Sequence, residues 1–212
     1  MTWLEVLVEG ASDAPTLREV LTRKFHLIEG EHFRIHPHKG KGKLPDKPLS
    51  RPDPKHQGLL DRLPATLRGF GKSLRPDAVV LVVIDADDQP LQLLLQDLNR
   101  MLDALPEKPQ VLFRIAVEET ESWFIADMNA LQKAFPVGLD KKVLKNIPAD
   151  AVVGAWEKLA LALHFNPKII TGPTKFEWAE KIAPYLDLEN PKSPSFRKLI
   201  EGVASILKPI QT

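Results

Sequence analysis

AVVLVVIDADD, residues 78–88, is the clearest structural signal in the sequence. Its continuous run of Val, Leu and Ile is typical of a strand buried on both faces of a parallel sheet, and its β-branched content favours strand over helix. The run ends at three carboxylates, Asp85, Asp87 and Asp88. Ligands of open α/β sheets bind beyond the carboxyl ends of strands, and oxygen ligands suit Mg²⁺, Mn²⁺ or Ca²⁺. The stretch therefore predicts a divalent-metal site at a sheet edge.

The composition of the 212 residues excludes several classes of protein. Lys and Arg number 29 against 28 Asp and Glu, so any binding of nucleic acid has to come from a local patch. There is no cysteine, which rules out disulfides and thiolate metal sites. No apolar run approaches the ~20 residues that span a bilayer, and the N-terminus lacks the basic region of a signal peptide. We expect a soluble, cytoplasmic protein without a membrane partner.

The N-terminal residues predict a strand, a turn and a helix. An apolar strand over 3–8 ends at Glu9 and Gly10, and apolar residues at helical spacing begin at Leu17. Asp13 stands at the entrance of that helix, where it either caps the helix or contributes to a site. Glu9, at the carboxyl end of a strand and beside a glycine, is harder to explain by capping.

A further strand, QVLFRIAV at 110–117, also ends in acidic residues: Glu118, Glu119 and then Glu121. Three strands thus each run into carboxylates where a helix begins. Right-handed crossovers bring the ends of parallel strands to one edge, so we expect these carboxylates to lie together. The alternative is ordinary capping at helix N-termini. Capping accounts for Asp13, Asp88 and Glu118 but poorly for paired Asp85 and Asp87.

Residues 36–57 form the most biased segment and are expected to be a long exposed loop. Residues 36–56 hold six Lys or Arg against two Asp, with three His and five Pro. The loop is either a basic arm that contacts a phosphate backbone or simply a solvated loop. The histidines lack the spacing of a zinc site. Gly71-Lys72-Ser73 is not a phosphate-binding loop, because no glycine stands five residues earlier.

The C-terminal part of the chain has the periodicity of helices only. We divide the chain into an α/β domain at 1–135 and a helical appendage at 136–212 that packs on it. Trp123, Phe124 and Trp178 lie at helical spacing and are expected in the core rather than as stacking platforms for bases.

Several motifs together resemble known families. VEG at 8–10 with Asp13, followed much later by IDADD, resembles a TOPRIM domain, the fold of topoisomerases, primases and OLD-type nucleases. The sequence also resembles the TOPRIM-like family called domain of unknown function 4276. The resemblance rests on several motifs in the same order: VEGASDAPTLREVL, HKGKGKL, LDRLPATLRGF, VVIDADD, RIAVEETESWFIAD, KFEWAEKIAPYLDLEN and SPSFRKLI. The resemblance covers almost the whole chain. The sequence departs from the pattern of that family in the additional proline-rich residues after HKGKGKL.

The resemblance implies a TOPRIM-like, mostly parallel sheet and a set of site residues. The expected ligands of Mg²⁺ or Mn²⁺ share a carboxylate and an origin near a strand end: Glu9, Asp13, Asp85, Asp87, Glu119 and Glu121. Glu9, Asp85 and Asp87, with Lys175 as the basic group near the phosphate, are the expected catalytic residues. The candidates for binding nucleic acid are basic: Lys39, Lys41, Lys43 and Arg114.

The expected function is a Mg²⁺-dependent nuclease that hydrolyses DNA or RNA with one or two metal ions. Families of this kind often act beside an AAA-type ATPase in phage defence, so such a partner is implied. Two alternatives stay open: a non-catalytic sensor or regulatory subunit of that ATPase, and a metal-dependent enzyme that acts on a small phosphorylated substrate. The oligomeric state is left open.

Overall fold

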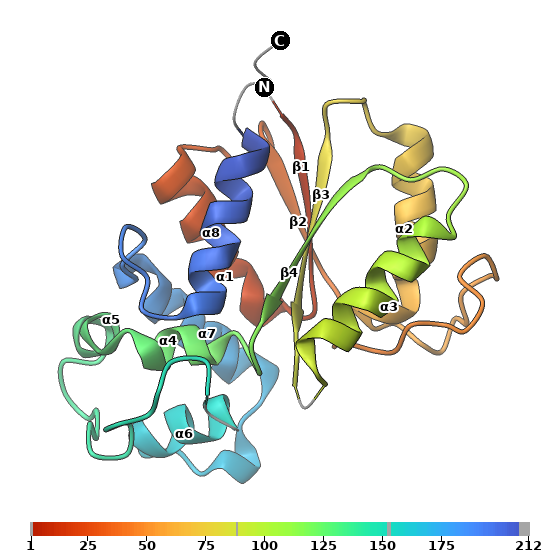
Figure 1. The fold of residues 1–212 in the computed structure, drawn as a ribbon. Coiled ribbons are helices and arrows are strands. Elements are labelled where there is room, and N and C mark those ends of the chain that lie inside the picture. The colour runs from red at the N-terminus through yellow and green to blue at the C-terminus, as the bar shows by residue number, and fades with distance from the viewer. Residues whose placement is uncertain (1, 88, 152–153, 208–212) are drawn as a thin grey trace.

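The computed structural model describes residues 2–87, 89–151 and 154–207. Its centre is a four-stranded sheet in the order β2-β1-β3-β4, in which every pair of neighbours is parallel (Figure 1). The strands are β1 (Leu4–Val8), β2 (Phe33–Pro37), β3 (Val79–Asp85) and β4 (Gln110–Ala116). Helices flank the sheet, so the expected α/β fold class is confirmed.

Helices connect the strands and make up most of the described chain after β4. They are α1 (Ala14–Glu19), α2 (Leu59–Ser73), α3 (Leu91–Asp103), α4 (Glu121–Ala126), α5 (Met128–Ala134), α6 (Ala155–Ala162), α7 (Gly172–Ile182) and α8 (Pro194–Leu207). Short helical turns are η1 (Ala11–Asp13), η2 (Val20–Lys24), η3 (Pro167–Ile169) and η4 (Ala183–Tyr185). None of the helices within the described residues is long and apolar enough to cross a membrane.

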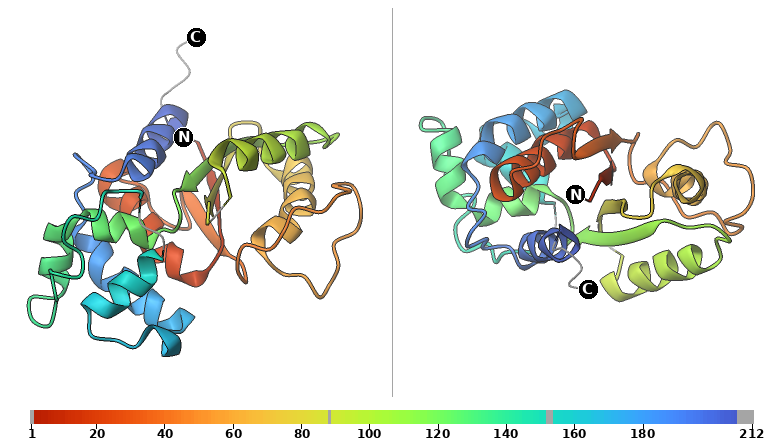
Figure 2. Two further views of the ribbon diagram at one scale, coloured as in Figure 1. Left: turned by 60° about the horizontal axis from the view of Figure 1, so that its bottom comes forward. Right: turned by 90° about the horizontal axis from the view of Figure 1, so that it is seen from above.

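The central strand β3 is apolar throughout because both of its faces are covered. Val79, Leu81 and Val83 belong to one hydrophobic cluster, and the residues between them belong to a second. The second cluster contains α2 and α3, whereas the first contains α1 and the helices from α4 to α8. Figures 1 and 2 show these two groups of helices on opposite sides of the sheet.

The C-terminal helices share the larger cluster with the sheet. Leu159 of α6, Trp178 of α7 and Leu199 of α8 are buried in the same cluster as Leu4 of β1. Trp123 and Phe124 are also buried there, at 1% and 2% exposure, which leaves neither ring available for stacking on a base. Residues 155–203 thus contribute directly to the core that supports the strands.

The order of the strands changes direction at β1 and β3. From β1 the chain passes to β2 on one side of it, and β3 then pairs on the other side. Such a switch in direction is where open parallel sheets bind ligands. The long β2–α2 loop is fastened to this edge, since the backbone N–H of Gly40 donates a 2.8 Å hydrogen bond to the carbonyl oxygen of Glu9.

Candidate functional site: a cluster of carboxylates at the sheet edge

Asp85 and Glu9 join the ends of the two central strands. Asp85 is the last residue of β3, and Glu9 follows β1, which pairs with β3. The backbone N–H of Asp85 donates a 2.8 Å hydrogen bond to Oε1 of Glu9. The parallel pairing therefore brings the two acidic residues together although 76 positions separate them in sequence.

Asp13 links the first helical turn to the connection after β4. Its Oδ2 accepts a 2.9 Å hydrogen bond from the backbone N–H of Gly10, and its Oδ1 accepts one of 3.0 Å from Oγ1 of Thr120. The side chain is almost fully buried, with a residue exposure of 6%. The bond to Gly10 is a capping interaction, while the bond to Thr120 is a long-range contact that capping alone does not require.

Glu119 and Glu121 approach from the β4–α4 connection. Oε2 of Glu119 accepts a 3.2 Å hydrogen bond from the backbone N–H of Trp156 at the start of α6. Oε1 of Glu121 lies 3.2 Å from the ammonium of Lys175, on α7. Glu121 is buried at 5% exposure, so this ion pair is largely shielded from solvent.

The carboxylates form one electrostatic group. The pKa of Asp85 lies well above its usual value, first because of burial and then because of the charges of Asp13, Glu9, Glu121 and Glu119. Burial is also the main cause that raises the pKa of Glu9 to about 8, that of Asp13 to about 6 and that of Glu119 to about 7. Like charges this close disfavour joint ionisation, so the group holds protons near neutral pH.

Asp87 lies at the border of this group, and its charge is the last of the causes that raise the pKa of Glu9. Its φ of 48° is left-handed, and its backbone N–H bonds to the carbonyl oxygen of Glu118. Its Oδ2 accepts a 2.8 Å hydrogen bond from the ammonium of Lys41 on the β2–α2 loop. The two aspartates of the D-x-D motif therefore face different partners: Asp85 faces the carboxylates, and Asp87 faces the loop.

Trp156 is an element of the site that the sequence analysis did not single out. Its half-buried ring lies 4.7 Å from the ammonium of Lys175, and its backbone holds Glu119. Lys175 thus contacts both a carboxylate and an aromatic face. The sequence shows only that Trp156 lies in a predicted helix. This alone does not distinguish a residue of the core from a residue of a site.

Arg114 lies outside the carboxylate group. Its guanidinium donates to the backbone oxygens of Lys198 on α8 and of Phe113, at 2.8 Å and 2.7 Å. A Cβ atom at Gly202 would stand 2.1 Å from Nη2 of this guanidinium, so the glycine makes room for it. Partial burial lowers the pKa of Arg114. In this structure the residue joins β4 to α8.

The three lysines of the loop occupy different surroundings. Lys41 contacts Asp87, Lys43 lines a pocket beside α3, and Lys39 is exposed.

Glu118, which sequence analysis explained by capping, accepts hydrogen bonds from the backbone N–H groups of Gly154 and Ala155 at the start of α6. Asp88, also expected to cap a helix, lies outside the described residues.

The arrangement of the carboxylates bears on metal binding. Within residues 2–87, 89–151 and 154–207, no three His, Asp or Glu side chains converge on a point that suits a metal ion. Three of the carboxylates instead have partners of their own: Glu9 accepts from the backbone N–H of Asp85, Glu119 accepts from that of Trp156, and Glu121 is paired with Lys175. The donors present are all oxygens, the type that Mg²⁺ and Mn²⁺ prefer, and a cation would relieve their mutual repulsion.

Comparison with known proteins assigns the chain to a family. A family model described as "Domain of unknown function (DUF4276)" matches residues 8–204. The chain belongs to the DUF4276 family. No curated protein and no solved structure matches it significantly.

The DUF4276 match spans every residue of the carboxylate group. It starts at Val8, the last residue of β1, and ends within α8, so it includes Glu9, the basic loop and Lys175. The α6 and α7 residues that hold Glu119 and Glu121 are therefore part of the family domain.

Proposed function

We propose that this DUF4276 protein is a divalent-metal-dependent nuclease of the TOPRIM type that hydrolyses phosphodiester bonds of DNA or RNA. The resemblance to TOPRIM rests on Glu9 after the first strand and on Asp85 and Asp87 at the end of a later one. An AAA-type ATPase that acts with the nuclease in phage defence is part of the same proposal.

One observation carries the proposal: five carboxylates from three strand ends gather at one edge of the sheet, where burial and mutual repulsion raise the pKa of Glu9, Asp13, Asp85 and Glu119. Glu9, Asp13, Asp85, Glu119 and Glu121 hold more negative charge than Lys175 neutralises. Burying such a set costs stability, because each charge loses hydration and repels its neighbours, so its presence indicates a function. Strongly raised pKa values in a crevice are typical of functional sites.

The same five side chains are the ligands that would hold Mg²⁺ or Mn²⁺. When bound, the cation would supply Lewis-acid activation of a water and stabilisation of the leaving oxygen. To hold it, the carboxylates would exchange their present donors for the cation. Lys41 and Lys175 stand on either side of the group, bound to Asp87 and Glu121, and provide positive charge for a phosphate.

Hydrolysis also requires a proton acceptor. The oxygen of water forms a bond to phosphorus, the bond between phosphorus and the leaving oxygen breaks, and the proton of water passes to a base. A carboxylate of the group that does not hold the cation, or bulk water, would accept it. The leaving oxygen then takes a proton from solvent or from the group.

A non-catalytic subunit of an AAA-type ATPase is the second candidate. The observation that favours it is that Glu9 and Glu119 keep protein donors and that the described carboxylates do not converge on a metal position. In that case the carboxylate group would respond to protons or to a bound partner without cleaving a phosphodiester.

Cleavage assays with a matched pair of variants test the proposal. Plasmid DNA and RNA are incubated with the protein in Mg²⁺ or Mn²⁺, beside Asp85→Asn and Asp77→Asn. Asp77 precedes the opposite end of β3 and forms an exposed pair with Arg75, so it controls for loss of an aspartate. The nuclease proposal predicts cleavage by the wild type and by Asp77→Asn only. Cleavage that survives in Asp85→Asn contradicts the site, and no cleavage by any of the three favours the non-catalytic subunit.

A further inference from the structure

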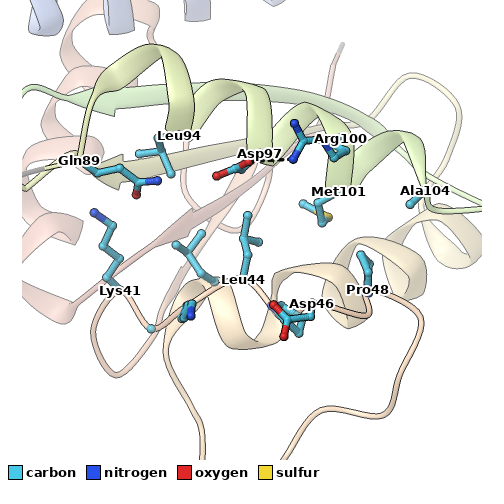
Figure 3. A pocket seen from close by; sticks show the side chains of 14 residues that line it. Lys41, Leu44, Asp46, Pro48, Gln89, Leu94, Asp97, Arg100, Met101 and Ala104 are labelled. Atoms are coloured by element: carbon cyan, nitrogen blue, oxygen red, sulfur yellow. Dashed lines mark hydrogen bonds and ion pairs between the residues drawn. The ribbon is translucent and has the colours of Figure 1, made fainter.

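A pocket of about 610 Å³ lies between the β2–α2 loop and helix α3, and Lys41, which bonds to Asp87, is among the residues that line it. Figure 3 shows Lys41 and Gln89 near one end of it and Ala104 near the other. Its volume falls in the range of sites that bind small organic ligands, about 300–1,000 Å³.

The walls of the pocket combine an apolar surface with a few charged groups. Leu44 of the loop faces Leu94 and Met101 of α3. The positive groups are Lys41, Lys43 and Arg100, and the negative groups are Asp46 and Asp97. Asp97 is paired with Arg100 at 3.2 Å and Asp87 with Lys41 at 2.8 Å, so a phosphate at this end of the pocket would meet Lys43 and the Lys41–Asp87 pair.

Lys41 connects the pocket to the carboxylate group. Its ammonium donates hydrogen bonds to Oδ2 of Asp87 and to the carbonyl oxygen of Ala86, at 2.8 Å and 3.0 Å. Its side chain is only 17% exposed, so the ammonium is held in place rather than free in solvent. A molecule in the pocket therefore has one end next to the residues that follow β3.

We propose that this pocket binds one unpaired nucleotide of the substrate strand, next to the phosphate that is cleaved. The inference rests on the proposed function and specifies its substrate as single-stranded nucleic acid. The phosphate contacts Lys41 and Lys43, and the base lies against the apolar walls. Asp46 and Gln89 accept hydrogen bonds from the amino and imino groups of the base. A base within a duplex is stacked and paired, so it enters such a pocket only after it is flipped out.

Binding measured without metal tests the pocket separately from cleavage. The probe is a short fluorescent single-stranded oligonucleotide in EDTA, followed by anisotropy, with a duplex of the same sequence beside it. Ala104→Trp narrows the pocket from an exposed position at the end of α3. Leu93→Trp is the matched control, because Leu93 is 53% exposed on the same helix and does not line the pocket.

We expect Ala104→Trp to weaken single-strand binding by about tenfold, while Leu93→Trp and the wild type bind alike. Duplex binding should be equal in all three proteins. Arg100→Glu is a second variant, since Arg100 is 78% exposed in its side chain and tolerates exchange; it should weaken single-strand binding in the same direction.

The outcomes separate this inference from the proposed function. Single-strand binding that Ala104→Trp leaves unchanged, or equal losses for single strands and duplexes, overturns the pocket even where cleavage persists. Selective loss of single-strand binding in Ala104→Trp supports the pocket, even where no variant cleaves nucleic acid and the nuclease proposal fails. Absence of binding to any probe overturns the inference.

Discussion

The backbone N–H of Asp85 and Oε1 of Glu9 are 2.8 Å apart, and this hydrogen bond joins the carboxyl ends of β3 and β1. It places two acidic residues at the position where the parallel sheet changes direction. The bond lowers the pKa of Glu9, yet burial and the charge of Asp13 together hold that pKa at about 8. The sheet edge thus collects more negative charge than its own hydrogen bonds neutralise.

Removing the charge of Asp85 should stabilise the metal-free protein. Asp85→Asn keeps the shape of the side chain and removes its repulsion with Asp13 and Glu9. At pH 8 we expect the free energy of unfolding to rise by about 1 kcal/mol, measured by urea denaturation. Asp77→Asn, at the exposed end of the same strand, should change it by less than about 0.5 kcal/mol. A clear destabilisation by Asp85→Asn would contradict the repulsion.

The metal-free protein should lose stability as the pH rises. Glu9, Asp13 and Glu119 have pKa values in the folded state above their ordinary values of 4.5, 3.8 and 4.5. The folded state therefore binds protons more tightly than the unfolded state. The stabilisation by these bound protons is complete below about pH 4 and is lost as the pH passes through about 6 to 8. We expect the free energy of unfolding in EDTA to fall by an amount on the order of 2 kcal/mol between pH 5 and 8.

The variant Glu9→Gln is a direct control for this pH dependence of stability. This variant removes the carboxyl whose pKa is raised to about 8, so its stability should fall less steeply between pH 6 and 8. Thermal unfolding followed by circular dichroism measures both curves. Parallel curves for the variant and the wild type would show that Glu9 does not titrate in this range.

Removal of the Lys175 ammonium beside Glu121 should destabilise the protein. Lys175→Met leaves Glu121 buried without its 3.2 Å partner and removes the contact of the ammonium with Trp156. We expect about 2 kcal/mol of destabilisation at pH 8. Lys181→Met is the matched control on α7, because Lys181 is exposed and stands 5.9 Å from the ring centroid of Phe135. It should cost less than about 0.5 kcal/mol, and equal losses would argue against a special role for the buried pair.

The contact between β4 and α8 should depend on the glycine at 202. Gly202→Ala introduces a Cβ about 2.1 Å from the guanidinium of Arg114, which has to leave its carbonyl partners. We expect a loss of about 1–3 kcal/mol in the free energy of unfolding. Gly69→Ala, on α2 where a Cβ meets nothing within 4 Å, should instead gain up to about 1 kcal/mol. A gain for Gly202→Ala would mean that Arg114 has another low-energy position.

The fold and the location of the carboxylates were predictable because their causes are local. The continuous apolar run of β3 reports burial on both faces, and helices on opposite sides of the sheet cover it as expected. Parallel strands bring their carboxyl ends to one edge, so Glu9 and Asp85 had to lie near each other once the strands were identified.

Other features depend on contacts between distant segments and leave no local pattern. The left-handed φ of Asp87 turns it toward Lys41, although alternation along an extended chain would place it beside Asp85. Arg114 was a candidate for binding nucleic acid, and the sequence did not show that its guanidinium also donates to the carbonyl oxygen of Lys198 on α8 beside Gly202. Trp156 gains its place only when α6 packs beside Glu119.

Calorimetric titration with Mn²⁺ tests the central claim that the carboxylate group is a divalent-cation site. The titration is done at pH 7 in two buffers with different heats of ionisation, on the wild type and on Asp85→Asn. The account predicts that the wild type binds Mn²⁺ and releases protons, because Glu9 and Glu119 hold protons near this pH, and that Asp85→Asn binds much more weakly. Equal binding by both proteins, or no binding by the wild type, would contradict it.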